Sequence, residues 1–201
     1  MLKEVMKQLK VSILFLIFFT LLTGLVYPFV VTGIAQLIFP WQANGSLIKN
    51  SGSILIGQSF NSTNYFWGRP SATLPYPYNA ANSSGSNMGP SNPSFLASVQ
   101  ERVKRLQQSD ATGHHLIPVD LVTASGSGLD PDISPLAAFY QVARIAKANH
   151  LPENEIENII NHLIKNRTLA ILGEPRVNVL ELNMALDQLR SAHGRATTQS
   201  R

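Results

Sequence analysis

A stretch of uncharged, mostly apolar residues near the N-terminus, Val11 to Phe39, constrains the fold of this chain more than any other feature. No charged side chain occurs between Lys10 and Lys49. As one helix, residues 11–31 measure about 31 Å, which matches the hydrocarbon core of a bilayer at about 30 Å. Fifteen of those 21 residues are Leu, Ile, Phe or Val. The sequence therefore predicts a transmembrane helix.

A cleaved signal peptide is the main alternative for this stretch. Its apolar region runs for about 7–15 residues and ends at a small-residue cleavage site. Here the apolar run is longer, and no Ala-x-Ala pattern lies near Tyr27-Pro28-Phe29. A lipoprotein signal would need a cysteine, and the chain has none. These features favour an uncleaved anchor.

The charges that flank the anchor predict its orientation. Lys3, Lys7 and Lys10 lie on the N-terminal side against one acidic residue, Glu4, and no basic residue follows until Lys49. The positive-inside rule then places the N-terminus in the cytoplasm. The prediction is a single-pass protein of the cytoplasmic membrane with a basic cytoplasmic tail, residues 1–10, and its main domain on the exterior, periplasmic side.

Two features of the anchor, residues 11–39, point beyond simple tethering. Pro28 removes a backbone donor and is expected to kink or end the first helical segment, with Phe29–Phe39 as an outer extension. Small residues that allow close helix contact are also present. They either face lipid or contact a partner helix, and they are Thr20, Thr23, Gly24, Thr32, Gly33 and Ala35.

The remainder of the chain is long enough for one domain, residues 40–190, followed by a polar, loose tail, residues 191–201. The net charge of +4 overstates its basicity, because the part beyond the membrane carries thirteen basic and eleven acidic residues. That near balance argues against nucleic-acid binding. The absence of cysteine excludes disulfides and thiolate metal sites.

The expected fold is a single N-terminal transmembrane helix plus a small mixed α/β (α+β) exterior domain with about four helices and a short sheet. Strand-like apolar runs occur at Ser53–Phe60 and Leu116–Ala124. The 3.6-residue periodicity and capping residues predict the helices. These begin near Pro93, behind Ser134 and Pro135 for residues 136–149, at Pro152, and after a capping box from Asn178 to Glu181 that leads to Leu189.

The strand at 116–124, a glycine-rich loop at 125–135 and the following helix form an arrangement that can bind anions or present a nucleophile. The Gly-Lys-Ser/Thr ending of a phosphate loop is absent, and Gly126-Ser127-Gly128 lacks the spacing of a nucleophile elbow. Asp130 and Asp132 are the right residue types for a divalent cation, or Asp130 fixes the loop by accepting backbone donors.

An exterior serine hydrolase is the alternative function, with Ser125 or Ser127 as nucleophile. His114-His115 and Asp130 would complete a triad, but the spacing matches no known geometry. A third reading is a binding module without partners in a larger complex.

Several segments together resemble the C subunit of the bacterial Kdp-type potassium-transporting ATPase, the KdpC family. They are the single N-terminal span, residues 65–71 (Tyr-Phe-Trp-Gly-Arg-Pro-Ser), the loop at 125–135 with Gln141 to Arg144 after it, and residues 173–183. The likeness covers roughly Lys7 to Leu189. Residues of these motifs are expected to shape loops or contact partners, with no catalytic and no metal-binding role: Trp67, Gly68, Arg69, Pro70, Ser125, Gly126, Ser127, Gly128, Asp130, Pro131, Gln141, Arg144, Gly173, Pro175, Arg176, Asn178 and Asn183.

The resemblance implies a non-catalytic accessory subunit. Its partners would be a channel-like subunit that binds potassium, a P-type ATPase subunit and a small membrane subunit, so that ATP and K+ are handled by the complex and no cofactor is bound directly. The family is associated with assembly and, as a catalytic chaperone, with raising the ATP affinity of the pump. The Asp-Lys-Thr-Gly motif of P-type pumps is absent here. An exterior domain cannot touch a cytoplasmic nucleotide. Either the effect is transmitted through the membrane helix and partner subunits, which is the alternative that we favour, or the predicted orientation is wrong.

Overall fold

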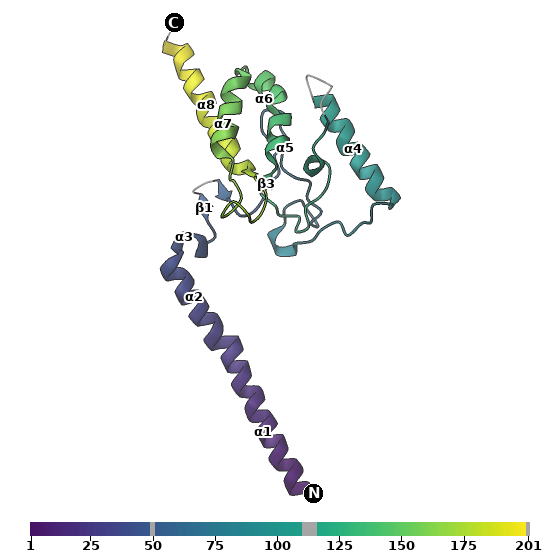
Figure 1. Ribbon diagram of the computed structural model, residues 1–201, viewed down its shortest axis with the longest axis vertical. Coiled ribbons are helices and arrows are strands. Elements are labelled where there is room, and N and C mark those ends of the chain that lie inside the picture. Colours follow the sequence, from purple (N-terminus) through teal and green to yellow (C-terminus); the bar gives the residue numbers. More distant parts are fainter. Residues whose placement is uncertain (49–50, 110–115, 200–201) are drawn as a thin grey trace. The chain divides into compact units, whose positions relative to one another are not determined.

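The computed structural model describes residues 1–48, 51–109 and 116–199 (Figure 1). The chain divides into two compact units, Met1–Lys49 and Asn50–Arg201. The predicted architecture is confirmed: a long apolar N-terminal helix precedes a small domain of several helices with very short strands.

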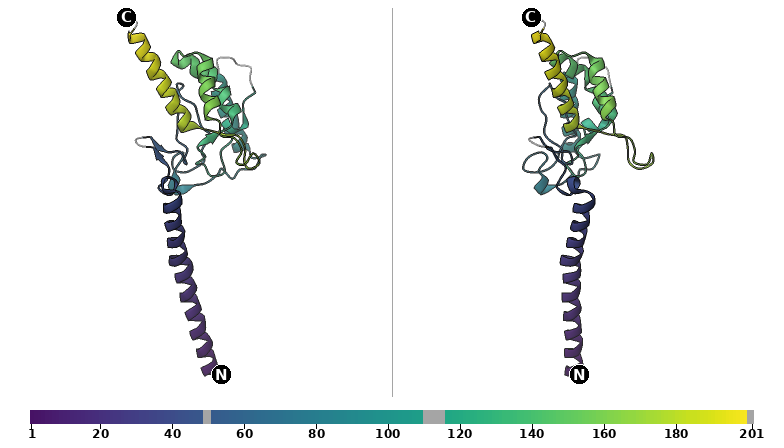
Figure 2. Two further views of the ribbon diagram at one scale, coloured as in Figure 1. Left: turned by 60° about the vertical axis from the view of Figure 1, so that its left-hand side comes forward. Right: turned by 90° about the vertical axis from the view of Figure 1, so that its left-hand side faces the viewer.

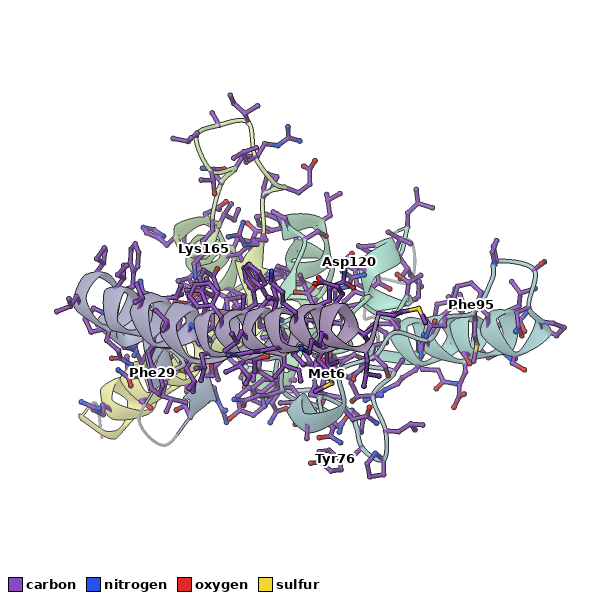
Figure 3. All side chains as sticks on the ribbon, turned by 90° about the horizontal axis from the view of Figure 1, so that it is seen from below. Met6, Phe29, Tyr76, Phe95, Asp120 and Lys165 are labelled. Atoms are coloured by element: carbon purple, nitrogen blue, oxygen red, sulfur yellow. The ribbon has the colours of Figure 1, made fainter. Side chains whose placement is uncertain are left out.

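The first unit is almost entirely one helix. It comprises α1 (Leu2–Leu21), the π-helical turn η1 (Leu22–Val26) and α2 (Tyr27–Ile38), followed by the short α3 (Pro40–Ala43) and β1 (Leu47–Ile48). The 37 residues from Leu2 to Ile38 are long and apolar enough to cross a membrane. None of their side chains is buried by the chain itself. Met6 and Phe29, labelled in Figure 3, are two of the exposed apolar residues on this helix.

Pro28 does not end the helix, contrary to one of the two outcomes expected from the sequence. The N–H of Tyr27, directly before the proline, donates to the carbonyl of Leu22, five residues earlier. A proline ring crowds the carbonyl four residues before it, and the wider π turn gives room for that group. The helix therefore continues through the turn, as Figure 2 shows, and stops only at Phe39, before Pro40.

The second unit contains a bundle of helices with a two-stranded sheet at its base. In chain order it consists of β2 (Gly52–Ser53), the 3-10 turn η2 (Ala80–Asn82), α4 (Pro93–Ser109), the 3-10 turn η3 (Val119–Leu121), β3 (Asp132–Ile133), α5 (Pro135–Tyr140), α6 (Val142–Asn149), α7 (Glu153–Leu163), β4 (Val177–Asn178) and α8 (Val179–Gln199). Strands β3 and β4 pair antiparallel, with Asp132 opposite Asn178 and Ile133 opposite Val177. Helices α5 to α8 lie together, whereas α4 lies to one side (Figure 1).

The predicted helix starts are confirmed by their caps. Ser134 Oγ accepts the N–H of Ala137 at 3.1 Å, and Asn178 Oδ1 accepts the N–H of Glu181 at 3.1 Å. Each such cap satisfies a donor that the first helical turn leaves without an intrahelical partner. Pro152 precedes α7, as expected.

The helix predicted at 136–149 is broken into α5 and α6 at Gln141. The side-chain amide of Gln141 donates back to the carbonyl of Ala137 at 3.0 Å, and its oxygen accepts the N–H of Trp67 at 2.8 Å. The second contact ties Gln141 to a segment 74 residues earlier, so the break coincides with a tertiary contact that periodicity cannot reveal.

The core of the second unit lies between α6, α7, α8 and the segment around Phe66. Ile156, Ile160, Leu182, Leu186 and Phe66 are fully buried. Burial of a side chain of this size stabilises a fold by about 1.5–3 kcal/mol. The apolar faces predicted for α7 and α8 are therefore the faces that form the core.

The two predicted strands, at 53–60 and 116–124, are wrong apart from the first residue of the former. The backbone after β2 makes turns, and residues 119–121 form the 3-10 turn η3. Here side chains bond the backbone: Arg102 Nη1 donates to the carbonyl of Val122 at 2.8 Å, and Asp120 accepts the N–H of Ser134 at 2.8 Å. Such bonds compete with a strand ladder.

Helix α8 continues to Gln199, so residues 191–199 are helical although the sequence suggested a loose tail. Ser191 Oγ donates to the carbonyl of Asp187 at 2.8 Å, and His193 Nε2 lies 2.7 Å from Glu155 Oε2 on α7. These contacts hold the beginning of the tail in the helix.

Candidate functional site

Several of the predicted motif residues gather around the segment Tyr65–Trp67, which has no neighbouring strand among the described residues. The side chain of Asn183 on α8 takes the place of such a strand at Phe66. Its Oδ1 accepts the Phe66 N–H at 2.8 Å, and its Nδ2 donates to the Phe66 carbonyl at 3.1 Å. One buried amide thus satisfies both backbone groups of a buried residue.

Gln141 does the same for the next residue. Its Oε1 accepts the Trp67 N–H at 2.8 Å, and its Nε2 donates to the Trp67 carbonyl at 3.2 Å. Gln141 is 1% exposed and Asn183 is 2% exposed. We refer to Gln141 and Asn183, with the four hydrogen bonds that they make to Phe66 and Trp67, as the amide clamp.

Arg144 supports this clamp from α6. It donates to Gln141 Oε1 at 2.6 Å, to the Tyr65 carbonyl at 3.0 Å and to the Thr63 carbonyl. Its guanidinium carbon lies 4.1 Å from the centre of the Trp67 ring, which is a cation–π contact. Burial, followed by the nearby charge of Arg105, lowers the pKa of Arg144 to about 10, so the side chain remains protonated at neutral pH.

The glycine-rich loop is bonded to the segment that follows Trp67. Asp130 Oδ2 pairs with Arg69 Nη1 at 3.0 Å, and Ser71 Oγ donates to the Gly128 carbonyl at 2.7 Å. Gly128 has a φ of 68°, and a Cβ there would lie 2.6 Å from the Ser84 carbonyl oxygen. The loop therefore needs glycine at this position both for its backbone angle and for its close contact.

Other predicted residues join the same network through their backbones. The carbonyl of Pro70 accepts the Ser125 N–H at 3.3 Å, and that of Pro131 accepts the Val179 N–H at 3.0 Å. A Cβ at Gly68 would lie 3.0 Å from Tyr78 Oη. Gly126, on the same loop, lies close to Gly85. A Cβ built on Gly85 would lie 2.9 Å from the carbonyl oxygen of Gly126.

The motif at 173–183 reaches the loop through Asp132. Arg176 Nε lies 3.1 Å from Asp132 Oδ2, and Asn178 Nδ2 donates to Asp132 Oδ1 at 3.0 Å. Burial raises the pKa of Asp132 above its ordinary value, against the lowering effect of the Asn178 hydrogen bond and the Arg176 charge. Gly173 and Pro175 lie in the turn before Arg176, with Gly173 at a φ of 80°.

The carboxylates of Asp130 and Asp132 are occupied by protein donors. Asp130 Oδ1 accepts the Asp132 N–H at 3.0 Å, so with Arg69, Asn178 and Arg176 each of the four oxygens has a partner. In the part of the chain that the structure describes, no group of three or more His, Cys, Asp or Glu residues is placed to hold a metal ion. The loop-fixing role of Asp130 is the one that the geometry supports.

Ser125 and Ser127, the candidate nucleophiles, also contribute to the structure of the loop. Ser127 Oγ accepts the N–H of Leu129 at 3.1 Å, which closes a turn, and Ser125 is buried. His114 and His115, the proposed bases of a hydrolase, lie outside the described residues. His162, on α7, bonds the carbonyl of Asn158 in its own helix at 2.7 Å. Among the described residues, the geometry gives neither serine a base.

Sequence reasoning missed three residues around Arg69. The hydroxyl of Tyr78 donates to the Arg69 carbonyl at 2.5 Å, and burial, followed by the charge of Asp130, raises its pKa to about 12. Arg102 and Arg105 reach the same region from α4, where Arg105 lies 4.6 Å from the centre of the Trp67 ring. For Arg102 and Arg105 the only available signal was a position on the polar side of an amphipathic helix, which is also typical of solvated arginines.

Comparison with known proteins gives one consistent result. The family model described as "KdpC: K+-transporting ATPase, c chain" matches residues 9–188. A protein of Methylococcus capsulatus named potassium-transporting ATPase KdpC subunit is 54% identical over 90% of this chain and 97% of its own length. Proteins of the same name from Herpetosiphon aurantiacus and Geobacter sulfurreducens are 56% and 53% identical, over 88% and 92% of this chain and 93% and 99% of their own lengths.

Proposed function

This chain belongs to the KdpC family, and from that premise we propose that it is the non-catalytic accessory subunit of an ATP-driven potassium uptake complex. One observation carries the non-catalytic part of the proposal. The polar side chains of the family motifs bond the domain's own backbone or one another, as the amide clamp and the Arg69–Asp130 pair do. Side chains that make such bonds maintain the conformation of the domain surface and do not attack a substrate.

The membrane helix supplies the first expected contact with other subunits. A Cβ added at Gly24 or at Gly33 would meet nothing within 4 Å in this chain. Small residues on a transmembrane helix allow a second helix to approach closely. We therefore expect these glycines to face a helix of the channel-like subunit, the P-type ATPase subunit or the small membrane subunit.

A second expected contact is the hairpin formed by residues 165–176, which we call the arm. Lys165 pairs with Arg176 and Thr168 with Leu172 through backbone bridges, and Arg167 forms an ion pair with Glu174 at 2.6 Å. Figure 2 shows the arm projecting from the helices of its unit. Its tip exposes three apolar side chains, Leu169, Ile171 and Leu172, to 82%, 77% and 61%.

An apolar tip on a braced hairpin is better explained by burial in a complex than by permanent exposure to water. The proposed occupant is a partner subunit of the same complex. Its contact would contribute to assembly, because the apolar area of the tip leaves water only when the partner is present.

The effect on ATP is proposed to be indirect. With the N-terminus in the cytoplasm and the main domain outside, the domain does not meet the nucleotide. A subunit that binds one conformation of the pump more tightly than the other raises the ATP affinity of the pump without touching ATP. The same linkage requires ATP to tighten the binding of this subunit to the complex.

Deletion of the chain from cells that rely on the pump tests the function. We expect loss of growth at limiting potassium, restored by the intact gene. Potassium uptake that is unchanged in the deletion strain would refute the proposal.

The orientation has an independent test, because the chain has no native cysteine to react. Single variants Lys3→Cys and Gln188→Cys are exposed to a membrane-impermeant thiol reagent in intact spheroplasts. We expect labelling of the variant at position 188 alone. Labelling of the variant at position 3 alone would reverse the topology and permit direct contact with ATP.

A further inference from the structure

A pocket of about 230 Å³ lies between α4 and the segment after Trp67. Three arginines line it: Arg69 from the motif segment, and Arg102 and Arg105 from neighbouring turns of α4. Among the described residues, no other residue type that is charged at neutral pH lines the pocket. We call it the arginine pocket.

The positive charge of the arginine pocket is only partly neutralised. Arg69 pairs with Asp130 at 3.0 Å. Arg102 donates to the Val122 carbonyl at 2.8 Å, and Arg105 to Asn61 Oδ1 at 3.4 Å, so both bond neutral acceptors. Neither has a carboxylate within ion-pair distance among the described residues. Arg102 is partly buried, with Glu101 nearby but not in an ion pair with it, and Arg105 is exposed. The pocket therefore carries positive charge that no ion pair at these two residues offsets, and this charge favours an anion.

Burial adds to the cost of this positive charge at two of the three arginines, Arg102 and Arg69. Burial lowers the pKa of Arg102, which reports a loss of hydration around that cation. The Nε of Arg69 is inaccessible to solvent and has no hydrogen-bond partner in the described chain. An anion in the pocket would offset both costs through its charge, since attraction at short range is strong where water is excluded.

The walls of the pocket are mainly apolar. Trp67, Tyr78 and Leu121 line it together with prolines. The volume lies below the range of about 300–1,000 Å³ that is typical of sites for drug-sized ligands. A small oxyanion with at most a short organic group fits this space, whereas a nucleotide is too large.

The location of the pocket gives such a ligand a structural effect. Leu106 is the only buried residue of the described helix α4, and α4 lies apart from helices α5 to α8 in Figure 1. An anion bound by Arg102 and Arg105 on one side and by Arg69 on the other would tie α4 to the motif segment. Its binding would therefore stabilise the folded domain.

We propose that the arginine pocket is a binding site for a phosphate group. Planar guanidinium groups match the oxygens of phosphate, and three of them suit a doubly charged anion better than a single carboxylate. The group belongs either to a free phosphate or to the headgroup of a phospholipid. This site does not depend on the proposed function.

Calorimetric titration of the full chain in a neutral detergent tests the site. The protein is first washed in high salt to exchange bound anions, and is then titrated in about 0.15 M salt, which weakens unspecific attraction. Inorganic phosphate and glycerol 3-phosphate are the probes. We expect saturable binding of one phosphate group per chain and a higher melting temperature in its presence.

Variants separate the pocket from general positive charge. Arg105→Gln and Arg102→Gln should each weaken binding by roughly ten- to a hundredfold, because each loses hydrogen bonds to a charged group. Lys104→Gln removes the same charge from an exposed position between them and should bind as the wild type does. Arg105→Lys keeps the charge without the fork of donors and should be intermediate. Melting curves without phosphate show whether each variant folds.

Bilayer discs distinguish the two sources of phosphate. The phosphate of phosphatidylcholine is neutralised by its own choline cation, so in discs of this lipid inorganic phosphate should still bind. If added phosphatidylglycerol abolishes that binding, a lipid headgroup occupies the pocket, and if binding persists, the ligand is a free phosphate. Absence of saturable binding of either probe in detergent, or equal affinities for Arg105→Gln and Lys104→Gln, would overturn the proposal.

Discussion

The two units of this chain use the same apolar residue types in opposite ways. From Leu2 to Ile38 the chain buries none of its own side chains, although most of them are large and apolar. In the second unit Ile156, Ile160 and Leu186 are fully covered by the chain itself. A substitution at one of these buried positions of the second unit therefore changes folding, whereas one in the first unit changes only what the surroundings can contact.

Among the variants that test this difference between the two units, we expect the largest effect for a substitution in the amide clamp. Asn183→Ala removes both partners of the buried Phe66 backbone and should lower the free energy of unfolding by about 3 kcal/mol. Denaturant unfolding of the full chain in detergent measures it. Gln188→Ala, at an exposed position on the same helix, is the matched control and should stay within about 0.5 kcal/mol of the wild type. A loss as small as that of the control would show that the clamp adds nothing to stability.

A substitution in the membrane helix should instead leave stability unchanged and weaken assembly of the complex. A Cβ added at Gly33 meets nothing within 4 Å in this chain, so with Gly33→Leu the stability of the second unit should not change. A bulky side chain there should prevent close approach of a partner helix and reduce recovery of the assembled complex by about tenfold. Co-purification with the other subunits measures the recovery. Ile34→Leu, which keeps side-chain volume at the neighbouring position, is the control, and equal recovery of both variants would place Gly33 against lipid.

The arm is expected to behave like the membrane helix although it belongs to the second unit. Replacing Leu169 and Ile171 by serine should change the free energy of unfolding by less than about 0.5 kcal/mol, because both side chains are exposed. The affinity of the subunit for its complex should fall roughly five- to tenfold through lost apolar contact. Thr168→Ser, at the base of the tip, serves as control. Unchanged affinity would show that the tip meets no subunit.

The smallest expected effect is a dependence of stability on pH that comes from Asp132. Because burial raises its pKa in the folded state, the folded chain binds this proton more tightly than the unfolded chain does. Between the ordinary and the raised pKa of this carboxyl, its contribution to the free energy of unfolding should therefore decrease as the pH rises. Asp132→Asn removes the titrating group, so the stability of the wild type relative to this variant should fall with pH over that interval and then level off. Glu157→Gln makes the same change of charge at an exposed site. A difference that grows with pH would contradict this sign.

The helices of the second unit were accessible from the sequence because their signals are local. Ser134 and Asn178 cap the helices that follow them, and the apolar stripes of α7 and α8 form the core. The membrane helix was equally accessible, since length and absence of charge are sufficient to predict it. In both cases the physical cause lies within a few residues of the element that it determines.

The clamp and the arginine pocket were not accessible in this way. Asn183 bonds a residue 117 positions away, and Gln141 one that is 74 positions away. The motif residues were identified through resemblance, but their contacts depend on the packing of α6 and α8. The strand predicted at 116–124 failed for a related reason, because Arg102 and Asp120 supply side-chain bonds in place of a strand partner.

The amide clamp also determines where the chain can accept insertions and deletions. Asn183 bonds residue 66 and Gln141 bonds residue 67, and the two amides are fixed at separate places, Asn183 on α8 and Gln141 at the junction of α5 and α6. Shifting the segment by one residue would present the wrong backbone groups to both amides at once and would remove Trp67 from Arg144. Length variation in this part of the protein should therefore accumulate in the turns before Thr63, while the spacing from Tyr65 to Arg69 stays constant.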